Sequence, residues 1–223
     1  FGGIANLALQ KLHRTAKENG ISVLLEGQGV DECFGGYAYY QSDILLDLLE
    51  TRQLSSLKKE IRHSIKNRQE IFTAIRRKLG DQNILFYQDG SSHLRPDLIS
   101  SALQPSSSSQ LAHLKPFDSR FDNAMFRDLR FTKLPRVLRM HDRMSMASSV
   151  ELRPAFLDHR VVEFAYRLPA TFKYSMGTGK RIWRDAMKDQ LPDIVRMAPK
   201  RAVVAPQREW FRGPLREWAM DTI

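Results

Sequence analysis

The sequence predicts a mostly helical α/β chain with a doubly wound parallel sheet, and three consecutive segments carry this prediction. Residues 4–19 place apolar side chains at helical spacing, and Gly20 follows where a helix-ending glycine belongs. Residues 21–25 are a short apolar run typical of a buried parallel strand. A glycine-rich turn then occupies residues 27–36. Because ligands bind beyond the carboxyl ends of such strands, we expect this turn to carry a site.

The elements that follow this turn are predicted to be largely helical. Helical spacing recurs at residues 43–49, 54–66 and 71–79. Residues 84–87 are too short an apolar run to distinguish a strand from a turn. Residues 104–110 contain four consecutive serines and predict a flexible surface loop, with a mobile lid as the functional alternative.

The composition is that of a folded globular protein. The chain has 223 residues, of which 42% are hydrophobic and 27% are charged. An excess of 35 Lys and Arg over 25 Asp and Glu gives a formal charge of +10, which favours an anionic partner. The basic residues lie at spacings typical of solvated helix faces, and no recognisable nucleic-acid-binding module accompanies them. We therefore expect no nucleic-acid partner.

The single cysteine, Cys33, excludes an intrachain disulfide and favours a reducing compartment. It is predicted to be a small buried hydrophobic residue beside Phe34, because the local sequence supplies no base to activate it. No apolar run approaches the roughly 20 residues that a membrane-spanning helix needs, and no basic-then-apolar leader opens the chain. We expect a cytoplasmic protein without a membrane partner.

The turn at residues 27–36 holds two adjacent carboxylates among four glycines. Gly27 and Gly29 let backbone N–H groups approach a phosphate or a carboxylate closely, because no Cβ intervenes. Asp31 is positioned to hold a hard cation such as Mg²⁺, which takes oxygen ligands and usually bridges to substrate phosphates. The alternative is a tight turn in which Asp31 and Glu32 merely cap the following helix.

A second dense region, residues 134–159, interleaves arginines with methionines and alanines. A helix here would be cationic on one side, and the forked guanidinium groups of residues such as Arg143 suit phosphate and carboxylate ligands. Asp142 and Glu151 offer the alternative of an ionic network that neutralises these arginines.

The third region, residues 177–184, is a glycine turn that delivers Lys180 to the start of a helix. It falls short of a phosphate loop, which needs two glycines five positions apart followed by Lys and Ser or Thr. Lys180 can still stabilise a negatively charged transition state as a point charge. Arg184 and Lys188 repeat the positive charge on one helical face, and we expect both to be solvated.

Taken together, these regions resemble the carboxyl-terminal synthetase part of the glutamine-hydrolysing asparagine synthetases, over essentially all 223 residues. The segments that carry the resemblance occur in the family's order: residues 27–37, residues 142–159, and Gly179-Lys180 ahead of residues 206–210. The resemblance implies a Rossmann-like synthetase domain of the adenine-nucleotide α-hydrolase type. It also implies that the chain is a fragment of a longer protein.

The implied reaction uses ATP and Mg²⁺ to adenylate the side-chain carboxylate of aspartate, with release of pyrophosphate. Ammonia that a separate amino-terminal glutaminase domain produces from glutamine then displaces AMP and gives asparagine. The residues present suit this chemistry, with a carboxylate for Mg²⁺ and cations where negative charge develops. The implied partners are these small molecules and the glutaminase domain, with a homodimer as a further expectation.

The resemblance also assigns roles to residues of this chain. Asp31 would be the metal ligand, and Lys180 would contact the phosphates as a catalytic residue. Gly27 and Gly29 would line the site of the pyrophosphate and the acyl-adenylate. The remaining candidates are Gln28 and Arg143 as catalytic residues and Glu32 and Ser145 as residues that bind substrate or ATP.

Two departures from the family pattern bear on activity. The family's loop commonly reads Ser-Gly-Glu-Gly-Ala-Asp-Glu, whereas here the glutamate between the two glycines is replaced by Gln28. An amide cannot accept a proton as a carboxylate can, so Gln28 implies an altered acceptor or a subfamily that does not need the acid. The family's Arg-Val-Pro-Phe-Leu-Asp appears at residues 153–158 with its proline moved to Pro154, which should alter the local backbone.

Two elements of a complete enzyme of this kind do not occur in the 223 residues. One is the Ser-Gly-Gly-x-Asp-Ser pyrophosphate loop, and the other is the amino-terminal cysteine nucleophile for glutamine hydrolysis. Both are expected upstream of Phe1 in a full protein. We therefore expect the isolated chain neither to hydrolyse glutamine nor to bind ATP well.

Two further functions stay open on the sequence alone. One is a related amide-forming ligase that acts on another carboxylate, for which Gln28 is the main support. The other is a catalytically silent scaffold whose basic helices bind a partner or an anionic polymer. An intact pyrophosphate loop in the complete sequence would favour either enzyme, and its absence would favour the scaffold.

Overall fold

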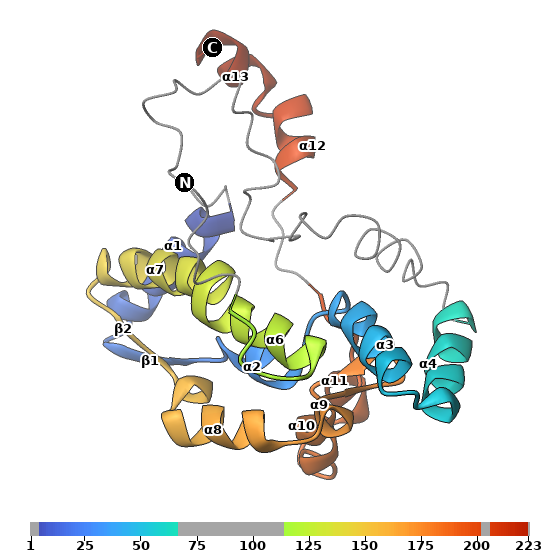
Figure 1. The fold of residues 1–223 in the computed structure, drawn as a ribbon. Coiled ribbons are helices and arrows are strands. Elements are labelled where there is room, and N and C mark those ends of the chain that lie inside the picture. Colours follow the sequence, from blue (N-terminus) through green and yellow to red (C-terminus); the bar gives the residue numbers. More distant parts are fainter. Residues whose placement is uncertain (1–4, 67–113, 202–205, 223) are drawn as a thin grey trace. The chain divides into compact units, whose positions relative to one another are not determined.

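The computed structural model describes residues 5–66, 114–201 and 206–222 (Figure 1). These residues are mostly helical, and their strands form two small sheets of two strands each. The mostly helical α/β character predicted from the sequence is therefore confirmed.

The chain divides into two compact units. The first unit comprises residues 1–24, 139–153 and 201–223, and the second comprises residues 25–138 and 154–200. The elements that lie wholly or mainly in the first unit are α1 (Ala5–Glu18), α7 (Leu134–Met146), β2 (Glu151–Pro154), α12 (Gln207–Arg212) and α13 (Arg216–Thr222).

Helix α1 confirms the first predicted helix, and Gly20 follows its end. Gly20 has a φ of 78°, the left-handed conformation that glycine adopts without a steric penalty. The Ile21 N–H donates to the carbonyl of Ala16 at 3.0 Å. This bond satisfies a carbonyl that the end of the helix would otherwise leave unpaired.

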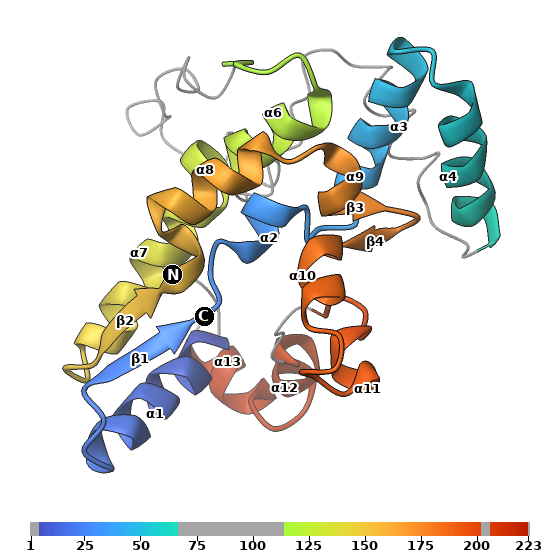
Figure 2. The same cartoon turned by 90° about the horizontal axis from the view of Figure 1, so that it is seen from below.

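Strand β1 (Val23–Glu26) pairs with β2 in the small parallel sheet, and Figure 2 shows the two strands side by side. The prediction of a buried strand is wrong, because Val23 is 39% exposed and Leu25 is 78% exposed. Successive side chains of a strand point to opposite faces. Val23 and Leu25 share the more exposed face of the strand, whereas the alternate residues are half-buried.

Helix α7 confirms that the arginine-rich region is helical in its first half. Arg139 and Arg143 are exposed, as expected for a helix with a cationic side. Glu151 pairs with Arg153 at 2.8 Å on the surface, so part of the positive charge is neutralised locally.

The second unit holds the remaining elements. They are α2 (Val30–Phe34), α3 (Tyr40–Glu50), α4 (Leu54–Lys66), α6 (Arg120–Arg127), the π-helical turn η5 (Asp128–Thr132), the 3-10 turn η6 (Ala155–Leu157), α8 (His159–Arg167), α9 (Ala170–Lys173), β3 (Tyr174–Ser175), β4 (Thr178–Gly179), α10 (Arg181–Ala186) and α11 (Asp193–Arg196). Helices α3 and α4 confirm the helices predicted over residues 43–49 and 54–66. The predictions for residues 71–79, 84–87 and 104–110 lie outside the described residues.

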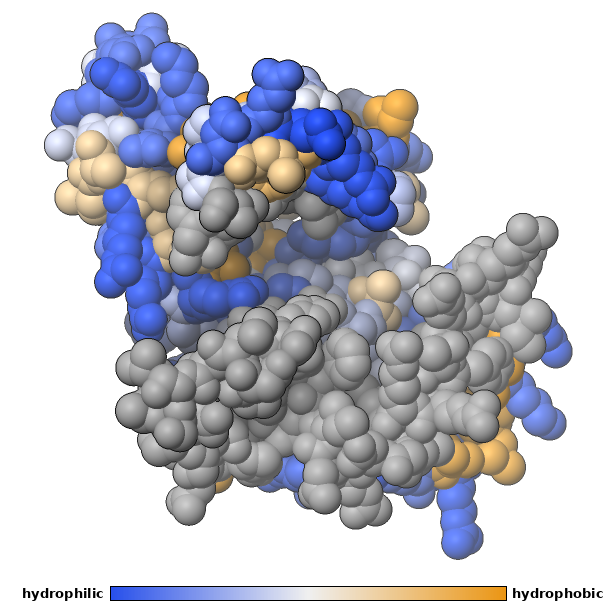
Figure 3. All heavy atoms as spheres, turned by 90° about the horizontal axis from the view of Figure 1, so that it is seen from above, coloured by the Kyte–Doolittle hydropathy of each residue, from blue (hydrophilic) through white to orange (hydrophobic). Residues whose placement is uncertain are grey.

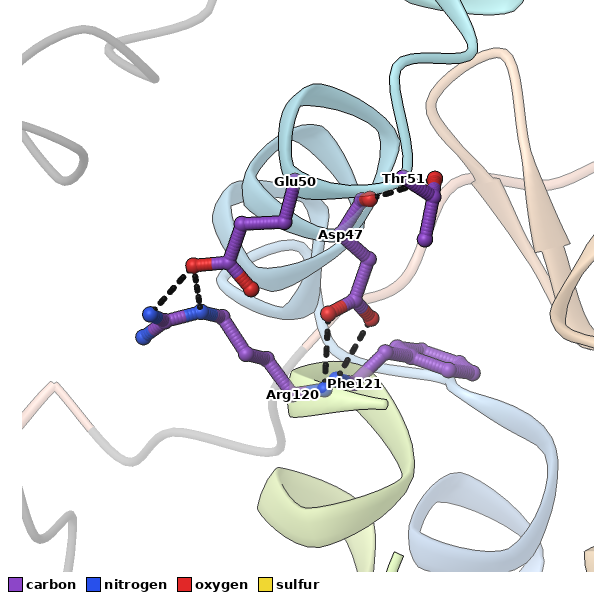
Figure 4. A network of polar contacts seen from close by, with 5 residues as sticks. All are labelled: Asp47, Glu50, Thr51, Arg120 and Phe121. Carbon is purple, nitrogen blue, oxygen red and sulfur yellow. Dashed lines mark hydrogen bonds and ion pairs between the residues drawn. The ribbon is translucent and has the colours of Figure 1, made fainter. Parts of the chain in front are cut away.

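The larger core of the second unit lies between α3 and α6. Tyr40, Phe121 and Tyr174 are almost fully buried there, and the Tyr40 and Phe121 rings meet edge to face with centroids 5.7 Å apart. Figure 4 shows how Asp47 of α3 clamps the start of α6 by accepting hydrogen bonds from the N–H groups of Arg120 and Phe121, at 2.7 and 3.0 Å. Packing and this clamp together fix α6 against α3.

A smaller core surrounds α2. Cys33 and Phe34 are fully buried, and the Phe34 ring meets the edge of Trp183 of α10 with centroids 5.5 Å apart. Burial raises the pKa of the Cys33 thiol to about 12, with a further contribution from the charge of Glu32. The prediction that Cys33 is a buried hydrophobic residue is confirmed, and the core holds α2 against α8 and α10.

Figure 3 shows one face of the molecule, on which hydrophilic residues predominate over the described surface and hydrophobic ones are interspersed. Among the described residues, no helix combines the length and the apolar character needed to cross a bilayer.

Candidate active site

The predicted glycine-rich loop is the connection between β1 and α2, together with the residues that end α2. Gly29 precedes α2 with a φ of 92°, and Gly35 ends it with a φ of 66°. Both are left-handed conformations that favour glycine. A Cβ on Gly29 would also lie 2.2 Å from the side chain of Leu157. The backbone conformation therefore favours glycine at both positions, and the close approach of Leu157 favours it further at Gly29.

The hairpin of β3 and β4 brings a second glycine turn onto this loop. Tyr174 is paired with Gly179 across the antiparallel strands, and the Lys180 N–H donates to the carbonyl of Phe34 at 2.9 Å. A Cβ on Gly179 would lie 2.1 Å from the carbonyl oxygen of Gly35. The absence of a side chain at position 179 thus allows the two backbones to meet.

This contact places Lys180 beside Asp31. The Lys180 Nζ lies 2.7 Å from Asp31 Oδ1, and the Lys200 Nζ lies 2.8 Å from Asp31 Oδ2. The side chains of Asp31 and Lys180 are only 14% and 24% exposed, whereas that of Lys200 is 41% exposed. The carboxylate therefore holds one ammonium group on each oxygen.

The pKa of Asp31 reflects two opposing influences. Burial raises it, but the hydrogen bonds and positive charges of Lys180 and Lys200 outweigh burial and bring the pKa below its ordinary value. Asp31 is thus ionised at neutral pH, and it is available only as a hydrogen-bond acceptor and a negative charge.

Lys180 occupies a special backbone position. It is the residue before α10, and its φ of 56° is left-handed although lysine carries a Cβ. Such conformations cost on the order of 1 kcal/mol or more and persist where the surroundings impose them. Here the hydrogen bond to Phe34 and the tight approach of Gly179 impose it.

Arg184 links the Lys180 turn to the segment that carries Lys200. Its guanidinium group donates to the carbonyls of Gly179 at 2.9 Å and of Ala198 at 3.0 Å, and also to that of Arg196. The expectation that Arg184 is solvated is therefore wrong. Five N–H donors in a planar fork suit it to gather several carbonyls, and these bonds fix the chain just before Lys200.

Glu32 forms a second polar group beside Asp31. It is buried and accepts a hydrogen bond of 2.6 Å from the hydroxyl of Tyr37. The Lys133 Nζ lies 3.3 Å from the centre of the Tyr37 ring, a close cation–π contact. Burial raises the pKa of Glu32 and lowers that of Lys133, because it disfavours the charged form of each.

Asp128 anchors the tyrosines next to this group. It accepts hydrogen bonds from the hydroxyls of Tyr39 and Tyr40 and, at 2.7 Å, from that of Thr132. Asp128 is the first residue of the π-helical turn η5, an uncommon element that often occurs near functional sites. These bonds hold Tyr39, on whose ring the Tyr37 ring stacks with centroids 5.3 Å apart.

The structure brings some of the predicted residues together. Asp31, Glu32 and Lys180 lie in one cluster of the second unit, and Gly27 and Gln28 belong to the same loop, where Gln28 is half-buried. Arg143 and Ser145 belong to α7 in the first unit. Arg143 is exposed there, and the buried Ser145 hydroxyl donates to the carbonyl of Asp142 at 3.1 Å.

The described residues do not fit a resident Mg²⁺ at Asp31. Both oxygens of the carboxylate are occupied by ammonium groups, and a metal would have to displace Lys180 or Lys200. Within the described ranges, no three His, Cys, Asp or Glu side chains gather as a metal site. Mg²⁺ depends on oxygen ligands, and the Asp31 carboxylate offers it no free oxygen while both lysines are in place.

Sequence reasoning missed four residues of this cluster: Lys133, Lys200, Tyr37 and Arg184. Tyr37 directly follows the glycine pair Gly35-Gly36, and this position is the only sequence signal for it. Lys133 and Lys200 lie in no local pattern, since only the tertiary fold brings them to residues 31–37.

A mostly helical α/β fold with a glycine-rich acidic loop facing a lysine turn is typical of the α/β class that binds ligands at the carboxyl ends of strands. The chain belongs to the Asparagine synthase family, whose match extends over residues 1–223. The domain of this family is of the adenine-nucleotide α-hydrolase type, which confirms the predicted fold class and the predicted family.

Individual relatives agree with this family. Asparagine synthetase [glutamine-hydrolyzing] 1 of Bacillus subtilis is 27% identical over 234 residues, covering 99% of this chain and 37% of the relative. A putative asparagine synthetase [glutamine-hydrolyzing] of Mycobacterium bovis is 29% identical over 239 residues, covering 99% of this chain and 36% of the relative. The chain thus spans little more than a third of the length of these relatives.

A differently named relative also matches. Amidase chyE of Penicillium rubens is 26% identical over 256 residues, covering 96% of this chain and 36% of the relative. No solved structure gave a significant match.

Proposed function

We propose that the chain forms part of the synthetase site of an ATP-dependent amide-forming ligase that converts aspartate to asparagine. The observation that carries the proposal is the pairing of Lys180 with Asp31 at the glycine-rich loop of an Asparagine synthase family member. The largely buried carboxylate of Asp31, 2.7 Å from the Lys180 Nζ, holds this ammonium group in place. A lysine held in this way can stabilise the negative charge that develops when a polyphosphate leaves.

In the proposed first step, an oxygen of the aspartate side-chain carboxylate bonds to the α-phosphorus of ATP, and the bond from that phosphorus to pyrophosphate breaks. Lys180 neutralises charge on the phosphates. The backbone at Gly27 and Gly29 approaches the pyrophosphate and the acyl-adenylate without steric obstruction. Asp31 orients the ammonium group of Lys180.

In the proposed second step, the nitrogen of ammonia attacks the acyl carbon, AMP departs, and the nitrogen loses a proton. Gln28 lies in the same loop and can orient the nucleophile through its amide, although it cannot accept the proton. Glu32 and Ser145 are proposed to bind substrate or ATP, and Arg143 is proposed to act as a catalytic cation. Family membership supports a glutaminase domain, in a longer protein, as the source of ammonia.

The test uses the protein expressed from its complete gene. With ATP, Mg²⁺, aspartate and either ammonium or glutamine, we expect pyrophosphate release that requires aspartate, and asparagine detected by mass spectrometry. Lys180→Met should lower release by about 100-fold or more, whereas Lys188→Met, which removes an exposed lysine outside the cluster, should leave it unchanged. Pyrophosphate release that is indifferent to aspartate would contradict the proposal.

A second candidate is a related ligase that joins an amine to a different carboxylate. Gln28, in place of the acid expected in the family's loop, favours it, as does similarity to a relative named as an amidase. A screen of pyrophosphate release against a panel of amino acids and other carboxylic acids separates the two candidates. Release with another acid and none with aspartate would select the second.

A further inference from the structure

The hairpin that leads into Lys180 turns through a strained residue. Strands β3 and β4 contain two residues each, and their register leaves Met176 and Gly177 as a two-residue loop. These loop residues have positive φ values of 52° and 70°, and a type I′ turn requires a positive φ at both positions. Gly177 adopts this conformation freely, whereas Met176 carries a Cβ and adopts it only where its surroundings impose it.

Glu60 of α4 supplies that support from a distant part of the sequence. Its Oε1 accepts a hydrogen bond of 2.7 Å from the Met176 N–H and one of 3.3 Å from the Ser175 hydroxyl. Met176 lies outside the paired residues of the hairpin, so Glu60 provides the acceptor for its N–H. The Glu60 side chain is buried, with an exposure of 6% for the residue, and Figure 2 shows the turn pointing toward α4.

The other end of the hairpin is fixed by α2 and α3. The Lys180 N–H donates to the carbonyl of Phe34 at 2.9 Å, and the hydroxyl of the buried Tyr174 donates to Gln41 Oε1 at 3.3 Å. Three residues separate Met176 from Lys180. Because the two strands are short and paired, a displacement of the turn is carried directly to Lys180.

From this geometry we infer that Glu60 is a positioning residue, which fixes the turn at Met176 and thereby the place of the Lys180 ammonium group. The inference deepens the proposed function and rests on it, because it is there that Lys180 acts on the phosphates. Glu60 itself acts through the hairpin and not on the substrate. Since Lys180 is proposed to stabilise charge that develops in the transition state, its misplacement lowers kcat and leaves the KM for aspartate nearly unchanged.

Turnover of the protein expressed from its complete gene tests this role. Glu60→Met keeps the length of the side chain but removes the acceptor, and kcat for pyrophosphate release per folded molecule should fall about tenfold through misplacement. Glu60→Gln keeps an oxygen acceptor and should stay within about twofold of the parent kcat. Asp47→Ala is the matched control, because Asp47 also accepts from backbone N–H groups but lies outside the hairpin. Equal kcat values for Glu60→Met and Asp47→Ala would overturn the inference.

A second substitution separates positioning from general stability. Met176 is 39% exposed, so Met176→Asn alters little packing, and Asn before Gly is favoured in type I′ turns. Added to Glu60→Met, it should restore most of the lost kcat, because the turn then holds its conformation without the carboxylate. A kcat per folded molecule that stays low in the double variant would mean that Glu60 does not act through the turn.

Hydrogen exchange gives a readout that involves neither aspartate nor turnover. In the parent protein the Met176 amide should be protected, and Glu60→Met should speed exchange at the amides of Met176 and Lys180. Fast exchange of Met176 in the parent would overturn the inference even if no variant folds. Failure of aspartate-dependent release, with the expected exchange result, would remove the proposed substrate and leave the positioning of Lys180 by Glu60 standing. An intact reaction in which Glu60→Met keeps the parent kcat would do the reverse.

Discussion

Asp31 and Asp47 are two aspartates of the second unit that each accept from several donors, but the donors differ in kind. Asp47 accepts from the backbone N–H groups of Arg120 and Phe121 and from the hydroxyl of Ser119, at 2.7 to 3.0 Å. Asp31 instead pairs with the ammonium groups of two lysine side chains, at 2.7 and 2.8 Å. The first set of donors is built into helix α6, and the second sits at the ends of long flexible chains.

The difference separates a structural carboxylate from an exchangeable one. The backbone donors of α6 cannot leave Asp47 unless the helix start unwinds, so that contact contributes to folding. The ammonium groups can leave Asp31 by side-chain rotation, so that contact can be traded for a ligand. Similar distances at the two sites therefore serve different purposes.

The largest effect is expected at the exchangeable site, which is Asp31 with its lysine partners. Lys180→Met should lower substrate-dependent pyrophosphate release by about 100-fold or more, the usual loss when a positioned electrostatic group is removed. Met keeps the length of the side chain, but the largely buried Asp31 carboxylate loses one of its two ammonium partners, so the thermal unfolding midpoint should fall and activity is compared per folded molecule. A coupled pyrophosphate assay, paired with circular dichroism melts, measures both. Normal turnover would mean that the contact of Lys180 with Asp31 is structural, like the contacts of Asp47.

The next largest effect is expected at Asp47, the structural carboxylate. Asp47→Ala should lower the free energy of unfolding by about 2 kcal/mol, because two N–H groups and one hydroxyl lose their acceptor at the start of α6. Urea denaturation gives this value. Pyrophosphate release per folded molecule should stay at the parent level, and a loss of activity at full stability would contradict the distinction between the two sites.

Gly36→Ala tests how tightly the exchangeable site is packed. The new methyl group would lie 1.8 Å from Asp31 Oδ1 and 2.7 Å from Lys180 Cε. Because side-chain ends can shift, we expect about a tenfold loss of pyrophosphate release from misplacement, with a stability cost of about 1 kcal/mol. Paired kinetic and urea measurements give both quantities. A variant that unfolds outright would mean that this site is as rigid as the one at Asp47.

Adjacent carboxylates in the loop should respond to pH with opposite signs. The lowered pKa of Asp31 means that its contribution to stability is complete above the ordinary value of 3.8 and is lost as pH falls through the folded value. The raised pKa of Glu32 means that its ionised form costs stability as pH rises above 4.5. Glu32→Gln should therefore raise the melting temperature at pH 7 and lose this advantage near pH 4, as melts at both values would reveal.

The smallest effect is expected at Arg120, whose side chain lies beside Asp47. Arg120 and Glu50 form an ion pair whose side chains are about half exposed, and Figure 4 shows it beside Asp47. Arg120→Ala keeps the backbone N–H that Asp47 accepts, so unfolding should weaken by less than about 0.5 kcal/mol. Urea denaturation at low and high salt checks this, since salt screens an exposed pair. A loss as large as that of Asp47→Ala would assign the clamp to the guanidinium.

Helices with a strong amphipathic pattern were predictable from the sequence, and α4 has the predicted bounds. The sequence placed Asp31 and Lys180 in the same site but did not predict that they pair. Each was recognisable because it lies in a glycine-rich turn, which is a local pattern. Lys200 could not be foreseen in the same way. Its position depends on the carbonyls that Arg184 gathers from distant residues, and no spacing in the sequence encodes that set.

The predicted burial of the first strand was wrong for a related reason, since Val23 and Leu25 of β1 are exposed. An apolar run predicts what a strand can bury, whereas its actual burial depends on its neighbours. Likewise, Arg184 carries the spacing of a solvated helix face, yet its guanidinium turns inward to backbone carbonyls. Local patterns thus located the elements, and long-range contacts decided the environment of individual side chains.

Position 180 combines a left-handed backbone with a lysine that the proposed chemistry requires. Glycine would relax that backbone and remove the ammonium group in one substitution. The relief of backbone strain and the loss of the ion pair with Asp31 change stability in opposite directions, whereas the loss of the ammonium group would by itself remove the proposed activity. A library screened for thermal tolerance needs a parallel screen for turnover wherever it samples this residue.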